Sequence, residues 1–175
     1  GTRCLRICAD STKLARRESN NNQPRRNGDR VVATVKKSAL VLYSAAEMYA
    51  LVNDIEAYPQ FLPWCRSAHV LICGPDELRA TIEMAKGGVH KSFTTFNRMQ
   101  KHKMIDIRLL EGPFKRLEGY WRFEPLRADA CKVSLDLEFE FSHLLRVAIE
   151  PVFKQIANSL VDAFCKRAVD LYGKR

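Results

Sequence analysis

Residues 131–141 of the chain read CKVSLDLEFEF, and a long amphipathic segment follows them. Apolar residues alternate with polar or acidic ones in this stretch. On a strand this alternation puts the apolar side chains on one face and the carboxylates on the other. The apolar set is Val133, Leu135, Leu137, Phe139 and Phe141. The stretch therefore predicts a strand whose inner face belongs to the core of a domain.

The segment from about residue 143 to residue 172 predicts one long helix. Apolar residues recur in it at steps of three and four, from Val147 to Leu171, which is the period of an amphipathic helix. Pro151 should kink this helix or begin its main part. An apolar sheet face needs a cover, and this helix is the longest element available. We therefore expect the sheet to curve around it.

The region before this strand predicts a first strand over residues 31–41, then two short helices. Ser44 is a candidate helix N-cap, and Glu47 stands at the capping-box position three residues later. We expect the first helix to end at Tyr58-Pro59, because the residue before proline disfavours helical geometry. The following PQFLP can form the second short helix.

Between these helices and residue 131 the chain predicts a run of antiparallel strands. The pair Gly87-Gly88 is a hairpin signal. Other turns fall near residues 74–76 and 112–113. The expected strands cover residues 67–73, 77–86, 89–100, 104–110 and 114–126. The fold class is thus α+β, with a curved antiparallel sheet of about seven strands around a C-terminal helix. A gap between helix and sheet, capped by the short helices, would be a natural apolar pocket.

Composition limits the range of functions. The chain has 175 residues and a net charge of +9, which suits one domain. Residues 1–30 hold eight basic and three acidic residues. We interpret 1–30 as a disordered basic extension and 31–175 as the folded domain. No apolar run is long enough to span a bilayer, and we expect a cytoplasmic monomer, with peripheral contact to the inner membrane left open.

Metal and catalytic motifs are not found. The six cysteines form no CxxC pair and the four histidines are dispersed, so no zinc pattern is present and reduced thiols are expected. Asp54 and Glu56 could serve as acid and base in a cyclase, but ordinary surface charges are the better interpretation. The sequence predicts no metal site, no cofactor and no catalytic residue, and hence a protein that is not an enzyme.

Four separated motifs carry a resemblance to a known family. They are LVNDIEAYPQFLPWC at 51–65, KSFTTFNR at 91–98, LLEGPFKRLEGYWRFEPL at 109–126, and EFEF at 138–141 with VFKQIANSLVDAFCKRAVDLY at 152–172. In this order they resemble the coenzyme Q-binding family of the START-like, helix-grip superfamily, which includes polyketide cyclases and aromatases. That family holds mitochondrial ubiquinone-binding proteins and bacterial RatA toxin-like proteins. The resemblance covers about residues 31–173.

Three functions follow from the resemblance as expectations. The first is binding of ubiquinone or a similar prenylated ligand, as a carrier or chaperone that supports respiration. The second is the RatA-type role, in which the protein binds the large ribosomal subunit and blocks its association with the small one. The third is a polyketide cyclase or aromatase. No catalytic residues are carried over.

The stretch AYPQFLPWCRS at 57–67 is the candidate lid of the pocket. Its two prolines stiffen the backbone, so its rings would present apolar surface at defined places. The alternative is that they only pack the short helices onto the sheet. Thr95 and Asn97 share the inner face with Phe93 and could bond a quinone oxygen or satisfy each other. The predicted ligand-binding residues are Tyr58, Phe61, Leu62, Trp64, Phe93, Thr95, Asn97, Phe114, Leu117, Trp121, Phe123, Phe153, Ile156, Leu160 and Phe164.

A second candidate site is a basic surface on outward strand positions and strand ends. It could bind ribosomal RNA or anionic lipid headgroups. No aromatic interleaving for base stacking is evident in the sequence, and a dispersed solvated surface is the alternative. The predicted residues are Arg98, Lys101, Lys103, Arg108, Lys115, Arg116 and Arg122.

Overall fold

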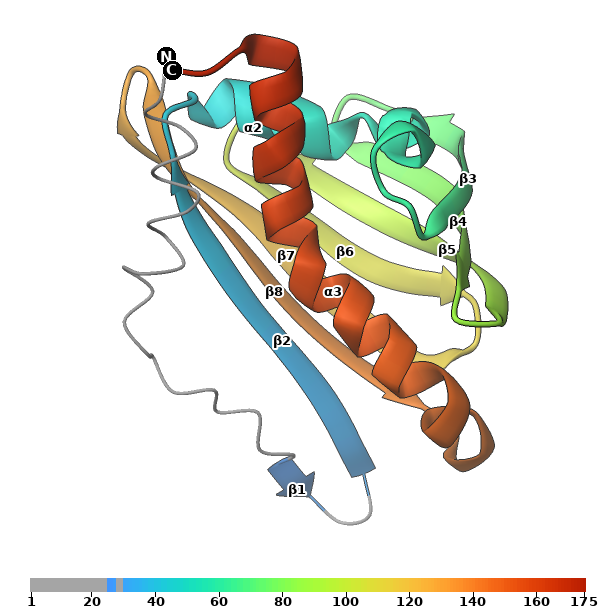
Figure 1. The fold of residues 1–175 in the computed structure, drawn as a ribbon. Helices are drawn as coiled ribbons and strands as arrows, with labels where there is room; N and C mark the ends of the chain where they lie inside the picture. The colour runs from blue at the N-terminus through green and yellow to red at the C-terminus, as the bar shows by residue number, and fades with distance from the viewer. Residues whose placement is uncertain (1–24, 28–29) are drawn as a thin grey trace.

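The computed structural model of the protein describes residues 25–27 and 30–175. One antiparallel sheet curves around a long helix, and a shorter helix and a 3-10 helix lie across one end of the sheet (Figure 1). The strands are β1 Arg25–Asn27, β2 Arg30–Val41, β3 Cys65–Cys73, β4 Glu77–Lys86, β5 Val89–Gln100, β6 Met104–Glu111, β7 Phe114–Arg127 and β8 Ala130–Phe141. The helices are α2 Ala45–Asn53, the 3-10 helix η1 Ile55–Gln60 and α3 His143–Tyr172.

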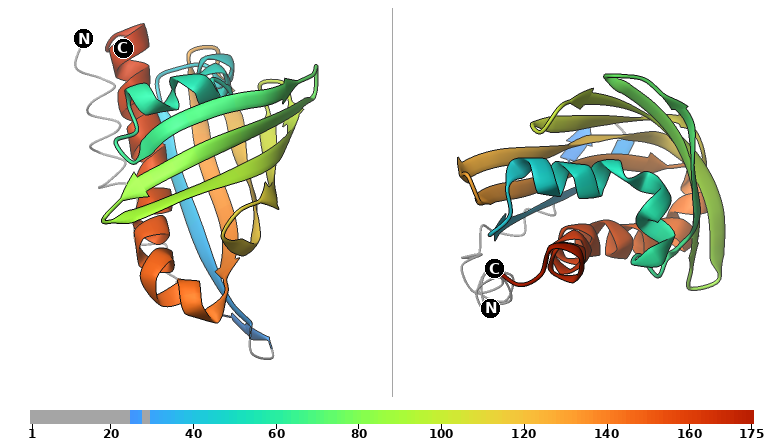
Figure 2. Two further views of the ribbon diagram at one scale, coloured as in Figure 1. Left: turned by 90° about the vertical axis from the view of Figure 1, so that its right-hand side faces the viewer. Right: turned by 90° about the horizontal axis from the view of Figure 1, so that it is seen from above.

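The strand order is β1-β2-β8-β7-β6-β5-β4-β3, so β8 lies between the first long strand and the rest of the sheet. Phe139 of β8 pairs with Ala33 on one side and with Leu117 on the other. Viewed from above, the sheet bends round α3, while α2 and η1 lie beside the C-terminal part of that helix (Figure 2). The predicted helix-grip architecture is confirmed.

The alternation of β8 sets the core as predicted. All five apolar residues of its inner face are at most 5% exposed. The inner faces of β4 and β7 follow the same rule, and the hairpin at Gly87-Gly88 forms with positive φ at both glycines. In the part of the chain that the structure describes, none of the helices is long and apolar enough to cross a membrane.

The first short helix differs from the prediction. The capping box of Ser44 and Glu47 is present, but α2 ends at Asn53 rather than at Tyr58-Pro59. The phenol of Tyr58 reaches back and donates a hydrogen bond of 2.6 Å to the carbonyl of Val52, near the helix end. The second short helix is η1, which contains Pro59 and starts before the predicted PQFLP.

The buried stripe of α3 also differs from the prediction. Val147 and Leu171 are 76% and 52% exposed, whereas Ile149, Phe153 and Ala157 are buried. The middle of the predicted stripe, at Ile156 and Phe164, is buried as expected, and the prediction is wrong at its two ends.

Strands at the two edges of the sheet complete the architecture. The short strand β1 pairs with β2, although we expected its residues to be part of a disordered extension. The rest of that extension, residues 1–24 and 28–29, lies outside the described residues. At the other edge, β3 carries the exposed side chains of Leu71 and Ile72. Its pairing with β4 is interrupted by register shifts at Cys65/Ser67 and at Val70/Ile72.

Gly119 lies where β7 passes close to the backbone of β8. A Cβ atom at this position would stand 2.1 Å from the carbonyl oxygen of Asp136 and 2.8 Å from Cα of Leu137. Both are backbone atoms, so neither can turn aside as a side chain could. The close approach of the two strands therefore depends on the absence of a side chain at Gly119.

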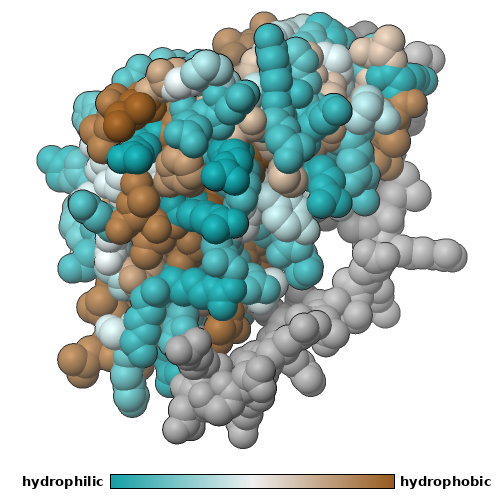
Figure 3. Space-filling model, turned by 180° about the vertical axis from the view of Figure 1, so that it is seen from behind, coloured by the Kyte–Doolittle hydropathy of each residue, from teal (hydrophilic) through white to brown (hydrophobic). Residues whose placement is uncertain are grey.

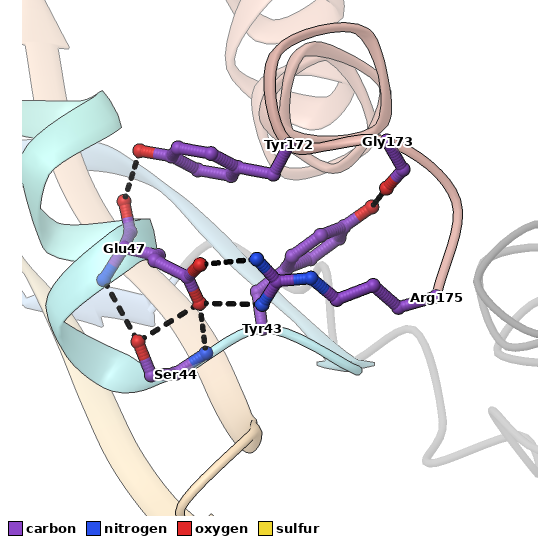
Figure 4. A network of polar contacts seen from close by, with 6 residues as sticks. All are labelled: Tyr43, Ser44, Glu47, Tyr172, Gly173 and Arg175. Carbon is purple, nitrogen blue, oxygen red and sulfur yellow. Dashed lines mark hydrogen bonds and ion pairs between the residues drawn. The ribbon is translucent and has the colours of Figure 1, made fainter.

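A polar network ties the start of α2 to the residues after α3 (Figure 4). The guanidinium of Arg175 donates hydrogen bonds of 2.6 and 3.0 Å to the two carboxylate oxygens of Glu47. Tyr172 donates to the carbonyl of Glu47 at 3.3 Å, and Tyr43 donates to the carbonyl of Gly173 at 2.5 Å. Hydrogen bonds from Arg175 and from Ser44 hold the pKa of Glu47 below its ordinary value.

The lowered pKa of Glu47 predicts a pH dependence of stability. The ionised carboxylate is favoured in the folded state, so its contribution is present above the ordinary pKa of about 4.5 and is lost as pH falls through the lower folded value. We expect Glu47→Gln to be less stable than the wild type at pH 7, and this difference to shrink between pH 5 and pH 3. Urea unfolding across this range measures it.

The matched variant for this test is Arg175→Gln, which keeps the carboxylate of Glu47 but removes the guanidinium that lowers its pKa. The stability of Arg175→Gln should therefore change less with pH between pH 5 and pH 3 than that of the wild type, as for Glu47→Gln. A difference between Glu47→Gln and the wild type that stays constant from pH 7 to pH 3 would contradict the assignment.

The crowded backbone at Gly119 predicts a large cost for one added methyl group. We expect Gly119→Ala to lower the free energy of unfolding by about 3 kcal/mol, at the upper end for overpacking. Gly74→Ala is the control, because the nearest atom to a Cβ there is 3.5 Å away. It should change stability by no more than about 0.5 kcal/mol. Equal unfolding midpoints for the two variants would refute the explanation.

Candidate functional site

The predicted ligand-binding residues all lie at the interior between α3 and the sheet or at its margin. Phe61 and Leu160 are half-buried, and the remaining predicted residues are less than 9% exposed. The predicted residues are therefore buried or half-buried, as residues of an inner face should be. Contact with a ligand stays a prediction.

The aromatic side chains of this interior form two packed clusters. Phe164 of α3 meets Tyr58, Phe61 and Trp121 with ring centroids 5.2–5.3 Å apart. Eleven residues earlier, and so about 16 Å along the helix, Phe153 packs edge-on against four rings. These are Phe93, Phe114, Phe139 and Phe141.

The candidate lid belongs to the first cluster. Tyr58, Leu62 and Trp64 are buried, and the Tyr58 ring packs on Phe164 at 5.3 Å. These side chains of the candidate lid are therefore packed in the interior, with Tyr58 against α3, and whether the segment also acts as a lid stays a prediction. Arg167 of α3 also covers the half-buried ring of Phe61, with its guanidinium carbon 5.1 Å from the ring centroid.

Three buried side-chain atoms lack a hydrogen-bond partner among the described residues. They are Nε1 of Trp64 in the candidate lid, Oδ1 of Asn97 on β5 and Oε2 of Glu150 on α3. Burying a donor or acceptor without a hydrogen bond costs about 1–3 kcal/mol, so such atoms are uncommon and mark places where a further group can bond. Asn97 was predicted from alternation, whereas no sequence signal points to Nε1 of Trp64.

Three buried titratable groups of the interior have raised pKa values, which keep them protonated near neutral pH. Burial raises the pKa of the Cys65 thiol to about 11 and that of Cys131 to about 12, so both stay protonated and unreactive near neutral pH. Burial also raises the pKa of Tyr58, whose hydroxyl is occupied by the Val52 carbonyl. Asp54 and Glu56 are exposed, as the surface interpretation predicted.

The predicted basic surface is exposed, but the structure divides it into two parts. Lys115 and Arg116 lie at the start of β7 and face acids of the neighbouring strand, with nitrogen–oxygen distances of 3.6 Å to Glu140 and 3.7 Å to Glu138. The other five cluster toward the β5–β6 turn. We call this second group the basic end, and it consists of Arg98, Lys101, Lys103, Arg108 and Arg122.

The basic end is less neutralised than the start of β7. Arg108 is paired with Asp106 at 3.5 Å and Arg122 with Glu124 at 3.9 Å. Arg98, Lys101 and Lys103 have no ion pair within the described part of the chain. Viewed from behind, the molecule shows hydrophilic side chains interspersed with apolar ones (Figure 3).

A hollow of about 180 Å³ opens on the outer face of β5 and β6. It is lined by Phe96, Arg98, Asp106 and Arg108. Sequence reasoning missed Phe96 as a site residue, although the alternation of β5 already placed it opposite the core residues. The structure thus adds an outward aromatic ring to the basic end.

Comparison with known proteins gives the family. A family model described as polyketide cyclase / dehydrase and lipid transport matches residues 41–165. The ribosome association toxin RatA of Escherichia coli strain K12 is 42% identical over 146 residues, which cover 83% of this chain and 92% of that protein. The mitochondrial coenzyme Q-binding protein COQ10 homolog B of Xenopus laevis is 30% identical over 79% of this chain and 59% of its own length.

Among solved structures, the Zhui aromatase/cyclase of Streptomyces has a similar fold. Its TM-score is 0.71 at 18% identity, with 82% of this chain and 99% of that one covered. This similarity supports the fold and carries no activity over. The two relatives above are named as a toxin and as a binding protein. The chain belongs to the polyketide cyclase / dehydrase and lipid transport family, among its RatA-like members.

Proposed function

We propose that the protein associates with the large ribosomal subunit and hinders its joining to the small one. The supporting observation is the 42% identity, over most of both chains, to a protein named ribosome association toxin. Ribosomal RNA presents a dense array of phosphates, and cationic side chains contact it with release of counterions. The basic end supplies such side chains.

The basic end is the better candidate for the contact surface, because more of its cationic side chains are unpaired within the described residues. A lysine already paired with a carboxylate gains less from a phosphate, because it must give up that partner. Lys101 and Lys103 are exposed and unpaired within the described residues, whereas Lys115 is paired with Glu140. We therefore place the RNA contact at the β5–β6 turn rather than at the start of β7.

The second candidate function is binding of a quinone-type ligand in the interior. The observation that favours it is Nε1 of Trp64, a buried donor without an acceptor among the described residues, since the carbonyl oxygens of a quinone only accept hydrogen bonds. The relative named as coenzyme Q-binding supports the same function. A prenylated ligand would have to part the rings that now pack on Phe164.

A cyclase or aromatase has less support. The buried polar residues within the described part of the chain are Thr95 and Asn97, and neither titrates as a general acid or base near neutral pH. The protonated thiols of Cys65 and Cys131 are not nucleophiles. We therefore propose a binding protein that is not an enzyme.

The ribosomal proposal predicts that purified protein lowers the yield of joined ribosomes from separated subunits. Sucrose-gradient sedimentation at increasing protein concentration measures it. Replacing Lys101 and Lys103 with Gln should weaken binding to the large subunit and reduce the salt dependence of the binding constant, by about 0.9 in logarithmic slope for each lost phosphate contact.

The matched control for this experiment is Lys115→Gln, because Lys115 is exposed but already paired with Glu140. It should leave subunit binding close to that of the wild type. Unchanged subunit joining at saturating wild-type protein would remove the proposal.

The quinone proposal predicts an effect of Trp64→Phe, which keeps an aromatic ring and removes the N–H. If Nε1 donates to a quinone oxygen, affinity should fall about two- to tenfold, the equivalent of one net hydrogen bond. Without ligand, the loss of an unpaired buried donor stabilises the variant, whereas the cavity left by the smaller ring destabilises it, so the stability of the free variant has to be measured beside its affinity. Quinone titration by fluorescence, beside thermal unfolding, separates the two effects. Equal affinities for the wild type and the variant would count against this function.

A further inference from the structure

The hollow on the outer face of β5 and β6 has an aromatic floor. Phe96 lies between Thr95 and Asn97, which are both buried on the inner face, so its ring points to the opposite side. It remains half-buried because the arginine side chains of the adjacent strands flank it. A large ring on the solvent side of a strand contributes nothing to the core, and its partial exposure leaves one area open to contact.

Three arginine residues neighbour Phe96 on the outer face of the sheet. The cross-strand neighbours of Phe96 are Arg79 on β4 and Arg108 on β6, and the guanidinium carbon of Arg79 is 5.8 Å from the ring centroid. Arg98 lies two residues along the same face of β5 and lines the hollow. Strand pairing therefore brings arginines from three strands to the neighbourhood of one phenyl ring.

The acids near the hollow only partly offset this charge. Asp106 lines it and is 3.5 Å from Arg108. Glu77 stands opposite Arg98 in the register, without an ion pair between them in the described structure. Glu118, opposite Arg108, is taken up by an ion pair with Arg116. The hollow is thus cationic, with one carboxylate at its wall.

We infer that this hollow binds one unpaired base of single-stranded RNA, with the base stacked on Phe96 and the adjoining phosphate held by Arg98 and Arg108. Bases in RNA loops are available for stacking on aromatic side chains, whereas bases inside a duplex are not. The carboxylate of Asp106 can accept a hydrogen bond from an exocyclic amino group of the base. A bare phosphate or a lipid headgroup would use the arginines but neither the ring nor the carboxylate.

The position of the hollow links this inference to the proposed function, on which it rests. Arg98 and Arg108 belong to the basic end, and the strands β5 and β6 that carry the hollow are joined by the turn with Lys101 and Lys103. A strand of RNA could therefore place a base on Phe96 while its neighbouring phosphates meet the two lysines. The hollow would provide a preference for unpaired regions that phosphate contacts alone cannot supply.

The test compares the full chain with three variants by fluorescence anisotropy. The probes are an unstructured eight-nucleotide RNA and an abasic ribose-phosphate oligomer of equal charge. We expect wild type to bind the base-bearing RNA at least fivefold more tightly than the abasic one. Phe96→Leu should abolish this difference, and Phe96→Tyr, which restores a ring, should retain it. Arg98→Gln should weaken the binding of both probes and reduce the slope of log binding constant against log salt concentration by about 0.7.

The same variants separate a failure of the base-stacking site from a failure of the proposed ribosomal function. Equal binding of the two probes by wild type, or unchanged RNA binding by Phe96→Leu, overturns the base-stacking site even where wild type still inhibits subunit joining. Ring-dependent RNA binding by a protein that leaves subunit joining unaffected supports the site and removes the ribosomal function. Ring-dependent binding to anionic phospholipid vesicles, in place of RNA, also overturns the inference. Thermal unfolding of each variant confirms that it is folded.

Discussion

The contact between α3 and the inner face of the curved sheet is the interaction on which the rest of the structure depends. Phe153 and Phe164 each pack against several rings of the sheet or of the candidate lid. Burial of this apolar surface holds the sheet in its bend. Because the bend leaves its outer face convex and solvated, the same contact also determines which side chains are displayed there. Interior and outer sites are therefore two faces of one sheet.

The two candidate sites make different demands on this arrangement. The outer site uses side chains that are already exposed, so binding there requires no change in the core. An interior ligand would have to take the place of packed rings, beginning near Phe61 and Leu160, which are half-buried. The unpaired Nε1 of Trp64 indicates where such a ligand could gain a hydrogen bond. Binding at the outer site therefore makes the smaller demand on the packing of the protein.

Much of the fold follows from local patterns in the sequence. Alternation in β8 and β4, the paired glycines at 87 and 88, and the capping box at Ser44 each act within a few residues, and all were predicted. The end of α2 was placed too late, because the prediction relied on Pro59 as the stop, whereas the helix ends at Asn53 and a separate 3-10 helix contains Pro59. The stripe of α3 was predicted correctly at Ile156 and Phe164 and wrongly at its ends, where Val147 and Leu171 are exposed.

For the sites, the sequence indicated which face a side chain takes but not its neighbours. It placed the predicted ligand-binding residues inward, yet could not show that they divide into two clusters. It found Arg98 and Arg108 but not Phe96, because the strand register that places Phe96 between Arg79 and Arg108 cannot be read from alternation alone.

The irregular pairing of β3 has a consequence for how copies of the protein meet. An edge strand with exposed Leu71 and Ile72 offers free backbone groups and apolar side chains to a second molecule. Register shifts beside these residues bend the edge out of a straight ladder, and such irregularity discourages intermolecular strand addition. The irregular edge of β3 is therefore a poorer template for a second copy than a straight strand with the same exposed side chains would be.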